Sequence, residues 1–241
     1  MSVQKKWATG YLAAFIIMLL LNYWSGTNVG SVANDNQAII QPAGFAFSIW
    51  GLIYVLLLIW IIKLFFSKTW EGSTAYQLKY WPIINFLLNG IWILVFTQQW
   101  MVVSVLVIIG LLYTLAKMYS AMTESGYHWF DRLPFSIYFG WVTIATVVNI
   151  FTLAVNNNIE TILGLGELTW TIIILSAATL IGIVITFYFR DWLYPLVLIW
   201  PYFGIYTEND NAHMILDVTL IAASVVLLIT ALIAGVRKLR H

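Results

Sequence analysis

Apolar residues fill this chain in long runs, and short polar segments separate the runs. Most runs are close to 20 residues long, which is the length that a helix needs to cross the hydrocarbon core of a bilayer. The pattern predicts eight helical segments, at residues 7–24, 45–66, 80–96, 101–122, 133–156, 168–189, 192–206 and 214–236. The seventh segment is short and contains two prolines, which favours a tilted or kinked helix.

The run at residues 133–156 carries side chains that a purely lipid-facing helix would not need. Tyr138, Trp141, Ala145 and Asn149 follow the spacing i, i+3, i+7 and i+11, so they fall along one stripe of a helix. A phenol, an indole and an amide on one stripe predict that this side faces protein or a cavity.

Two other runs have polar and aromatic faces of the same kind. Trp50 and Tyr54 are four residues apart in the second run, and Asn85, Asn89 and Trp92 share a face of the third. Buried amides need hydrogen-bond partners, so these faces are expected to turn toward one another or toward a ligand. Packing between helices and the lining of a pocket are both consistent with the pattern.

The composition agrees with a membrane protein and excludes several functions. The 241 residues are 62% hydrophobic and 9% charged, with a mean hydropathy of +0.90, whereas soluble domains carry about 25% charged residues. The net charge of +1 without a basic cluster argues against a nucleic-acid partner. Cysteine is absent, the three histidines are scattered and no nucleophile–base pair is evident, so neither a metal site nor a catalytic site is predicted.

The charged residues divide between the two sides of the predicted membrane protein. If all eight segments cross, all eleven Lys and Arg residues fall on one side together with both termini. The loops on the opposite side contain six acidic residues and no basic residue: Asp35, Glu160, Glu167, Glu208, Asp210 and Asp217. By the positive-inside rule, the sequence predicts a multi-pass protein of a bacterial cytoplasmic membrane with both termini inside.

Three motifs follow one another in the order of a known membrane family. They consist of Pro42, Phe47, Trp50 and Tyr54 in the second segment, Asn89, Trp92 and Phe96 in the third, and Tyr138, Trp141, Val142, Ala145, Asn149 and Asn156 in the fifth. In these residues the chain resembles the TspO/MBR family of tryptophan-rich sensory proteins. The resemblance covers residues 7–156.

The resemblance implies a fold and a ligand. It implies an all-α bundle with a five-helix core at residues 1–156, followed by three additional spans at residues 157–241. It also implies a pocket for an apolar ligand such as a porphyrin or haem, without a required cofactor. The residues expected to line this pocket are Trp50, Tyr54, Asn89, Trp92, Tyr138, Trp141 and Asn149.

The chain also departs from the family pattern and leaves another function open. Leu153 replaces an aromatic residue, and Ala154 replaces the arginine of a proposed sterol motif, so that motif gives no support for sterol binding. The sequence Phe-Ser-Ile-aromatic occurs at residues 47–50 and again at 135–138, which keeps a secondary transporter with an inverted repeat as the alternative. The expected partners are the lipid bilayer and a small apolar ligand, with a homodimer left open.

Overall fold

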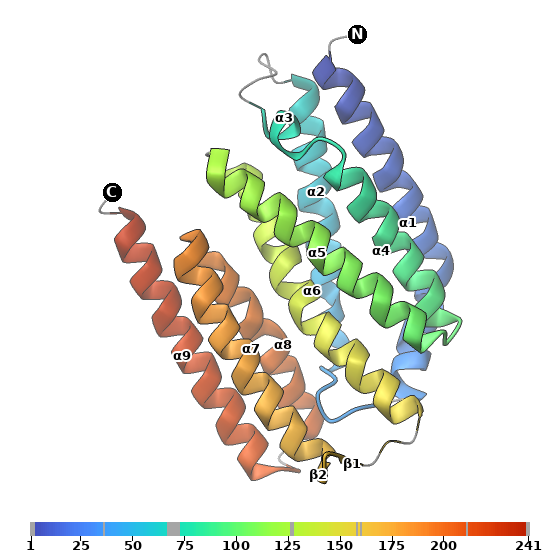
Figure 1. Ribbon diagram of the computed structural model, residues 1–241, viewed down its shortest axis with the longest axis vertical. Helices are drawn as coiled ribbons and strands as arrows, with labels where there is room; N and C mark the ends of the chain where they lie inside the picture. The colour runs from blue at the N-terminus through green and yellow to red at the C-terminus, as the bar shows by residue number, and fades with distance from the viewer. Residues whose placement is uncertain are drawn as a thin grey trace. The chain divides into compact units, whose positions relative to one another are not determined.

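The computed structural model of the chain is built almost entirely from helices (Figure 1). It describes residues 3–35, 37–66, 73–125, 128–157, 159, 161–210 and 212–239. The helices are α1 (Val3–Asp35), η1 (Gly44–Ser48), α2 (Ile49–Phe66), α3 (Thr74–Leu78), α4 (Trp81–Thr97), α5 (Met101–Ser125), α6 (Trp129–Asn156), α7 (Glu167–Phe189), α8 (Leu193–Asn209) and α9 (Met214–Leu239). Two short strands, β1 (Thr161–Ile162) and β2 (Leu165–Gly166), precede α7. The predicted all-α class is confirmed.

Each of the eight predicted segments contains one long helix. Six of these helices, α1, α2, α5, α6, α7 and α9, are long and apolar enough to cross a membrane. The other two, α4 and α8, have 17 residues each, which gives a length of about 25 Å against a hydrocarbon core of about 30 Å. The protein is therefore a multi-pass integral membrane protein, while the crossing of α4 and α8 and the orientation of the termini stay predictions.

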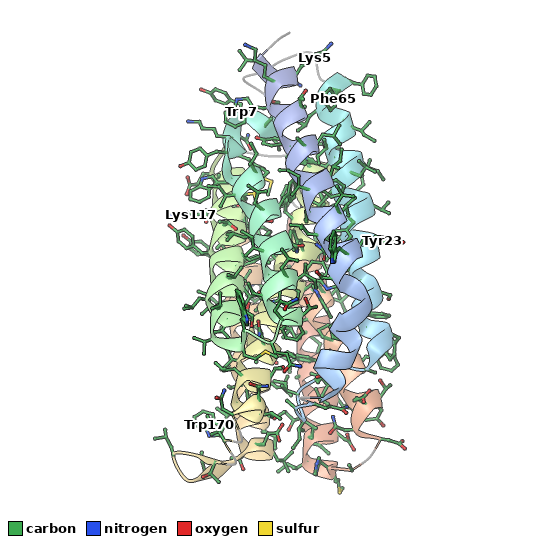
Figure 2. The ribbon with its side chains drawn as sticks, turned by 90° about the vertical axis from the view of Figure 1, so that its right-hand side faces the viewer. Lys5, Trp7, Tyr23, Phe65, Lys117 and Trp170 are labelled. Atoms are coloured by element: carbon green, nitrogen blue, oxygen red, sulfur yellow. The ribbon has the colours of Figure 1, made fainter. Side chains whose placement is uncertain are left out.

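Large apolar side chains cover the outer faces of the long helices. Leu106 on α5 and Val184 on α7 each expose more than 60% of their surface, and Tyr23 projects outward from α1 (Figure 2). A soluble protein would not expose contiguous apolar surface of this kind, because water would drive it to associate. The outer faces are suited to lipid.

The contacts divide the chain into two compact units, each built from two stretches of sequence. The first unit contains residues 1–32 and 50–139, and the second contains residues 33–49 and 140–241. The sequence pattern instead predicted a domain boundary between residues 156 and 157. The two divisions differ because α6 is one continuous helix, and its first turns pack in the first unit while the rest packs in the second.

In the first unit, α4 and α5 form an antiparallel pair joined by a very short turn, in agreement with the four residues left between the predicted segments 80–96 and 101–122. Gln98 and Gln99 make this turn, and Gln99 has a φ of 58°. Along the helix pair, the Asn85 amide donates to the Thr114 hydroxyl over 2.7 Å. Asn85, which shares a helix face with Asn89, is thus used to join two helices.

In the second unit, α7, α8 and α9 pack against one another, and η1 packs against α8. The backbone N–H of Ala43 donates to the carbonyl of Gly204 over 3.0 Å, and the Trp200 indole donates to the carbonyl of Ala46 over 2.9 Å. Between α6 and α7, β1 and β2 pair through a tight turn in which Leu163 and Gly164 both have positive φ. The first two contacts hold the second half of α8 against Ala43 and Ala46.

The end of α1 and the beginning of α6 differ from the predicted boundaries. The polar segment after Ser25 was predicted to be a loop, but α1 continues to Asp35, because extending an existing helix adds one hydrogen bond for each residue that is fixed. The fifth segment was predicted to begin at Leu133, but α6 begins one turn earlier. That extra turn is stabilised by Asp131, which forms a 2.7 Å ion pair with Lys63 of α2.

Candidate functional site

Four polar side chains from four helices of the first unit form one chain of hydrogen bonds. The Tyr54 hydroxyl on α2 donates to the side-chain oxygen Oδ1 of Asn22 on α1 over 2.9 Å. The side-chain amide of Asn22 donates to Oδ1 of Asn89 on α4, also over 2.9 Å. The side-chain amide of Asn89 in turn donates to the Tyr138 hydroxyl on α6 over 2.8 Å. Asn89 and Tyr138 are fully buried. These hydrogen bonds give the buried polar groups partners, and without partners their burial in a membrane interior would cost free energy.

An aromatic row lies next to this hydrogen-bond chain and consists of Trp50, Trp92 and Phe96. The rings of Trp50 and Trp92 have centroids 6.3 Å apart, and those of Trp92 and Phe96 have centroids 5.4 Å apart. The interplanar angle is 29° in both pairs. Tyr138 meets Trp50 edge to face at 5.7 Å, so the row is held from the side. Trp50 is half-buried, whereas Trp92 and Phe96 are buried.

Five of the seven predicted site residues therefore come together in the first unit. They are Trp50, Tyr54, Asn89, Trp92 and Tyr138. The other two, Trp141 and Asn149, belong to the second unit, where both are buried. There the Trp141 ring packs edge to face on Phe47, with centroids 5.6 Å apart. The binding role of all seven residues stays a prediction.

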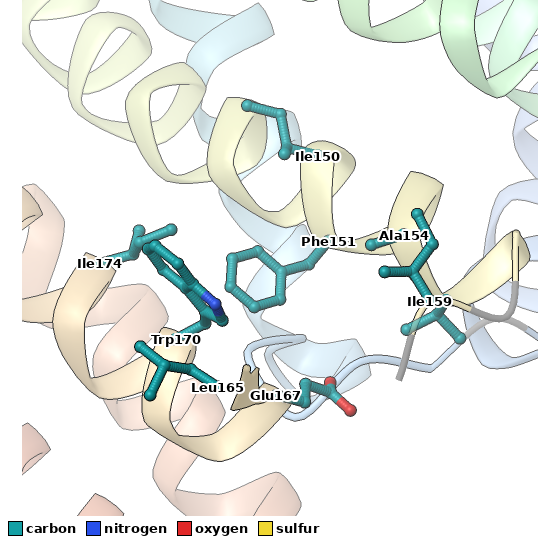
Figure 3. Close-up of a pocket in the computed structure, with 9 residues that line it drawn as sticks. Ile150, Phe151, Ala154, Ile159, Leu165, Glu167, Trp170 and Ile174 are labelled. Atoms are coloured by element: carbon teal, nitrogen blue, oxygen red, sulfur yellow. The ribbon is translucent and has the colours of Figure 1, made fainter. Parts of the chain in front are cut away.

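A separate cavity lies in the second unit, between the last turns of α6 and the first turns of α7 (Figure 3). Its volume is about 170 Å³. Apolar side chains form most of its wall, and one carboxylate belongs to it; the lining includes Ile150, Phe151, Ala154, Leu165, Glu167 and Trp170. None of the seven predicted residues lines this cavity.

Comparison with known proteins identifies the family. A family model described as TSPO-like protein matches residues 7–233. The chain belongs to the TSPO-like family. Neither the curated proteins nor the solved structures gave a match to this chain.

The match extends beyond the part of this TSPO-like protein that the motifs covered. The resemblance on individual residues ended at Asn156, but the matched region continues through α7 and α8 and into α9. The description of these three helices as additions to the family pattern therefore has no support.

Sequence reasoning missed two features of this TSPO-like protein. The first is Asn22, which links Tyr54 to Asn89. The sequence indicated this residue only because it is the single amide side chain inside the first apolar run, three residues before the polar segment. The cavity was missed because its walls are separated in sequence and meet only through folding. Ala154 was noted as a departure from the family pattern, and it proves to line this cavity.

The titratable residues of this TSPO-like protein do not suggest metal chemistry. In the part of the chain that the structure describes, no three His, Asp or Glu side chains lie close enough to hold a metal ion. The polar groups of the candidate site are neutral amides and phenols, which can orient a ligand by hydrogen bonding. The arrangement is suited to binding.

Proposed function

We propose that this TSPO-like membrane protein binds a flat apolar ligand of the tetrapyrrole class, for sensing, handling or transport. The observation that supports the proposal is the aromatic row of Trp50, Trp92 and Phe96. Its rings are tilted by only 29° from one to the next, and a macrocycle can continue such a row by offset stacking. Trp50 is the half-buried member of the row, so its ring is the one that the ligand would reach first.

The hydrogen-bond chain has a supporting role in this proposal. The Asn89 amide and the Tyr138 hydroxyl are bonded to each other, so they hold α4 and α6 in place. Ligand affinity then comes mainly from stacking and from the burial of apolar surface. Replacing an aromatic ring of the row should consequently weaken binding more than replacing an aromatic ring elsewhere.

A titration with protoporphyrin tests this proposal. The Soret band of the porphyrin is recorded as purified protein is added in detergent, because this band is free of the background from 13 tryptophans. The wild-type protein is expected to shift the band in a saturable way. Trp50→Phe is expected to weaken binding by about tenfold, since a lost stacking contact of this kind is worth about 1 kcal/mol or slightly more.

Trp100→Phe is the matched control for this experiment. Trp100 is 61% exposed at the turn between α4 and α5 and lies outside the aromatic row. Its replacement is expected to leave the affinity unchanged. If the band does not shift in a saturable way, or if both variants bind as tightly as the wild type, the proposal is contradicted.

Secondary transport, the alternative function, has weaker support. The first copy of the Phe-Ser-Ile-aromatic sequence spans the junction between η1 and α2, whereas the second lies inside α6 after its first turn. An inverted repeat would be expected to place both copies in similar local structure. The two copies differ, and ligand binding is the better-supported function.

A further inference from the structure

The cavity between α6 and α7 has the size of a site for one aromatic ring. Its volume is about 170 Å³, and an apolar protein cavity of roughly 150 Å³ is known to hold benzene. A tetrapyrrole macrocycle joins four rings and would not fit. Any ligand of this cavity is therefore different from the ligand proposed for the aromatic row.

The walls of the cavity suit an aromatic ligand. Phe151 from α6 and Trp170 from α7 present their rings next to each other at its centre, and Ile150 and Ile174 lie farther out (Figure 3). Aromatic walls stack favourably on an aromatic ring, and their faces also attract a cation that lies over them. The walls thus favour a ligand that combines a ring with a positive charge.

Glu167 supplies the charge in the lining of this cavity. It lies in the first turn of α7, and its carboxylate points toward the side of the cavity where Ile159 lies (Figure 3). One of its carboxylate oxygens accepts a 2.5 Å hydrogen bond from the backbone N–H of Ile39, which fixes the side chain. A carboxylate can accept about four hydrogen bonds, so Glu167 keeps the capacity to bind a further donor.

The charges around the cavity also favour a cation. At the end of the second unit where α7 and α9 begin, the charged residues that the structure describes are all acidic: Glu167, Glu208, Asp210 and Asp217. The basic residues Arg190 and Arg237 lie at the opposite ends of α7 and α9. Separated charges of this kind raise the local concentration of small cations near the acidic end.

We propose that this cavity binds a small aromatic ammonium ion. The ring occupies the apolar space that Phe151 and Trp170 line, and the ammonium group donates to the carboxylate of Glu167. This site is independent of the aromatic row in the first unit. It gives the TSPO-like protein a second ligand class, defined by one ring and one positive charge.

Binding of 4-fluorophenethylammonium tests the proposal. The protein is kept in detergent micelles, the fluorine signal of the probe is followed by NMR, and the signal from protein-free micelles is subtracted. Saturable binding is expected for this cation. At least tenfold weaker binding is expected for uncharged 4-fluoroethylbenzene and for the anion 4-fluorophenylacetate. Equal affinity for the cation and the uncharged probe would overturn the proposal, because the cavity would then select only apolar molecules.

A substitution at Glu167 with a matched control at Glu208 locates the site. Glu167→Gln keeps an acceptor for the Ile39 N–H but removes the charge, and it is expected to weaken cation binding by about tenfold. Glu208→Gln removes an acidic residue at the same end of the unit that does not line the cavity and instead accepts from Gln37, so it is expected to leave the affinity unchanged. Equal losses in the two variants would overturn the proposal, because binding would then depend only on the general negative charge.

Ala154→Phe fills the cavity and is expected to abolish binding of the probe. Ala154 is part of the lining, and the added ring takes the space that the ligand needs. If Ala154→Phe folds and binds the probe with unchanged affinity, the probe is bound elsewhere and the proposal fails. If this variant does not fold, the comparison of Glu167→Gln with Glu208→Gln still decides the outcome.

Discussion

Asn89→Leu is expected to lower the free energy of unfolding by about 2 kcal/mol. Asn89 accepts from Asn22 and donates to Tyr138, so one side chain connects α1, α4 and α6. Leucine has a similar volume but no polar atoms, and it leaves the fully buried Tyr138 hydroxyl without the donor it has in the wild type. The Asn22 amide keeps its bond to the Met18 carbonyl, which limits the loss.

The prediction is checked by unfolding the purified protein in mixed micelles with increasing SDS, with far-UV circular dichroism as the measurement. Tyr138→Phe removes only the hydroxyl at one end of the hydrogen-bond chain and is expected to lower the free energy of unfolding by about 1 kcal/mol. Tyr113→Phe, at a tyrosine that is 54% exposed on α5, is the matched control and should change nothing. The double variant Asn89→Leu/Tyr138→Phe should cost less than the sum of the single variants, since both remove the same hydrogen bond. A purely additive result would mean that Asn89 and Tyr138 do not stabilise each other.

The helices themselves could be predicted from the sequence because each depends on local information. An apolar run of sufficient length specifies a membrane helix by itself, and the four residues left between the runs at 80–96 and 101–122 predict the short turn between α4 and α5. Boundaries next to polar residues were less certain. The end of α1 and the beginning of α6 moved because polar residues can remain helical, as Asp131 does with its partner Lys63.

The candidate site was only partly predictable, for a geometric reason. Tyr138 and Asn149 lie on one stripe of α6, but eleven residues of helix separate them by about 16 Å. A stripe identifies the face of a helix and does not identify which neighbour packs at each level. Tyr138 therefore joins Asn89 in the first unit, while Trp141 packs on Phe47 in the second.

The cavity could not be predicted from the sequence because it depends on contacts between distant residues. Glu167 appeared only as one of several acidic loop residues. Its importance comes from the first turn of α7, where it lines the same cavity as Trp170 and accepts a hydrogen bond from the backbone N–H of Ile39, 128 positions earlier in the chain. Helical periodicity carries no information about such a contact, since it involves a backbone N–H that every residue except proline possesses.

Gly204→Ala is expected to destabilise the protein by about 2 kcal/mol, although alanine is normally favoured over glycine inside a helix by about 1 kcal/mol. A Cβ atom at Gly204 would lie 2.8 Å from the Cβ of Pro42 and 2.9 Å from the Cβ of Ala46. Neither neighbour can rotate away, because one belongs to a proline ring and the other is the only side-chain carbon of its residue. The backbone N–H of Ala43 also donates to the carbonyl of Gly204. Moving α8 away from residues 42–46 would therefore lengthen this hydrogen bond.

Gly51→Ala is the matched control, because it is the same substitution in a helix at a position where the new Cβ atom contacts no neighbour. A Cβ atom at Gly51, on α2, would have no heavy atom within 4 Å. This variant should therefore be neutral or stabilise the protein by up to about 1 kcal/mol, as helix propensity alone requires. Thermal unfolding of both variants in the same detergent measures the difference, which should be about 2 to 3 kcal/mol. If Gly204→Ala is as stable as Gly51→Ala, the close packing of α8 on Pro42 and Ala46 within the second unit is wrong.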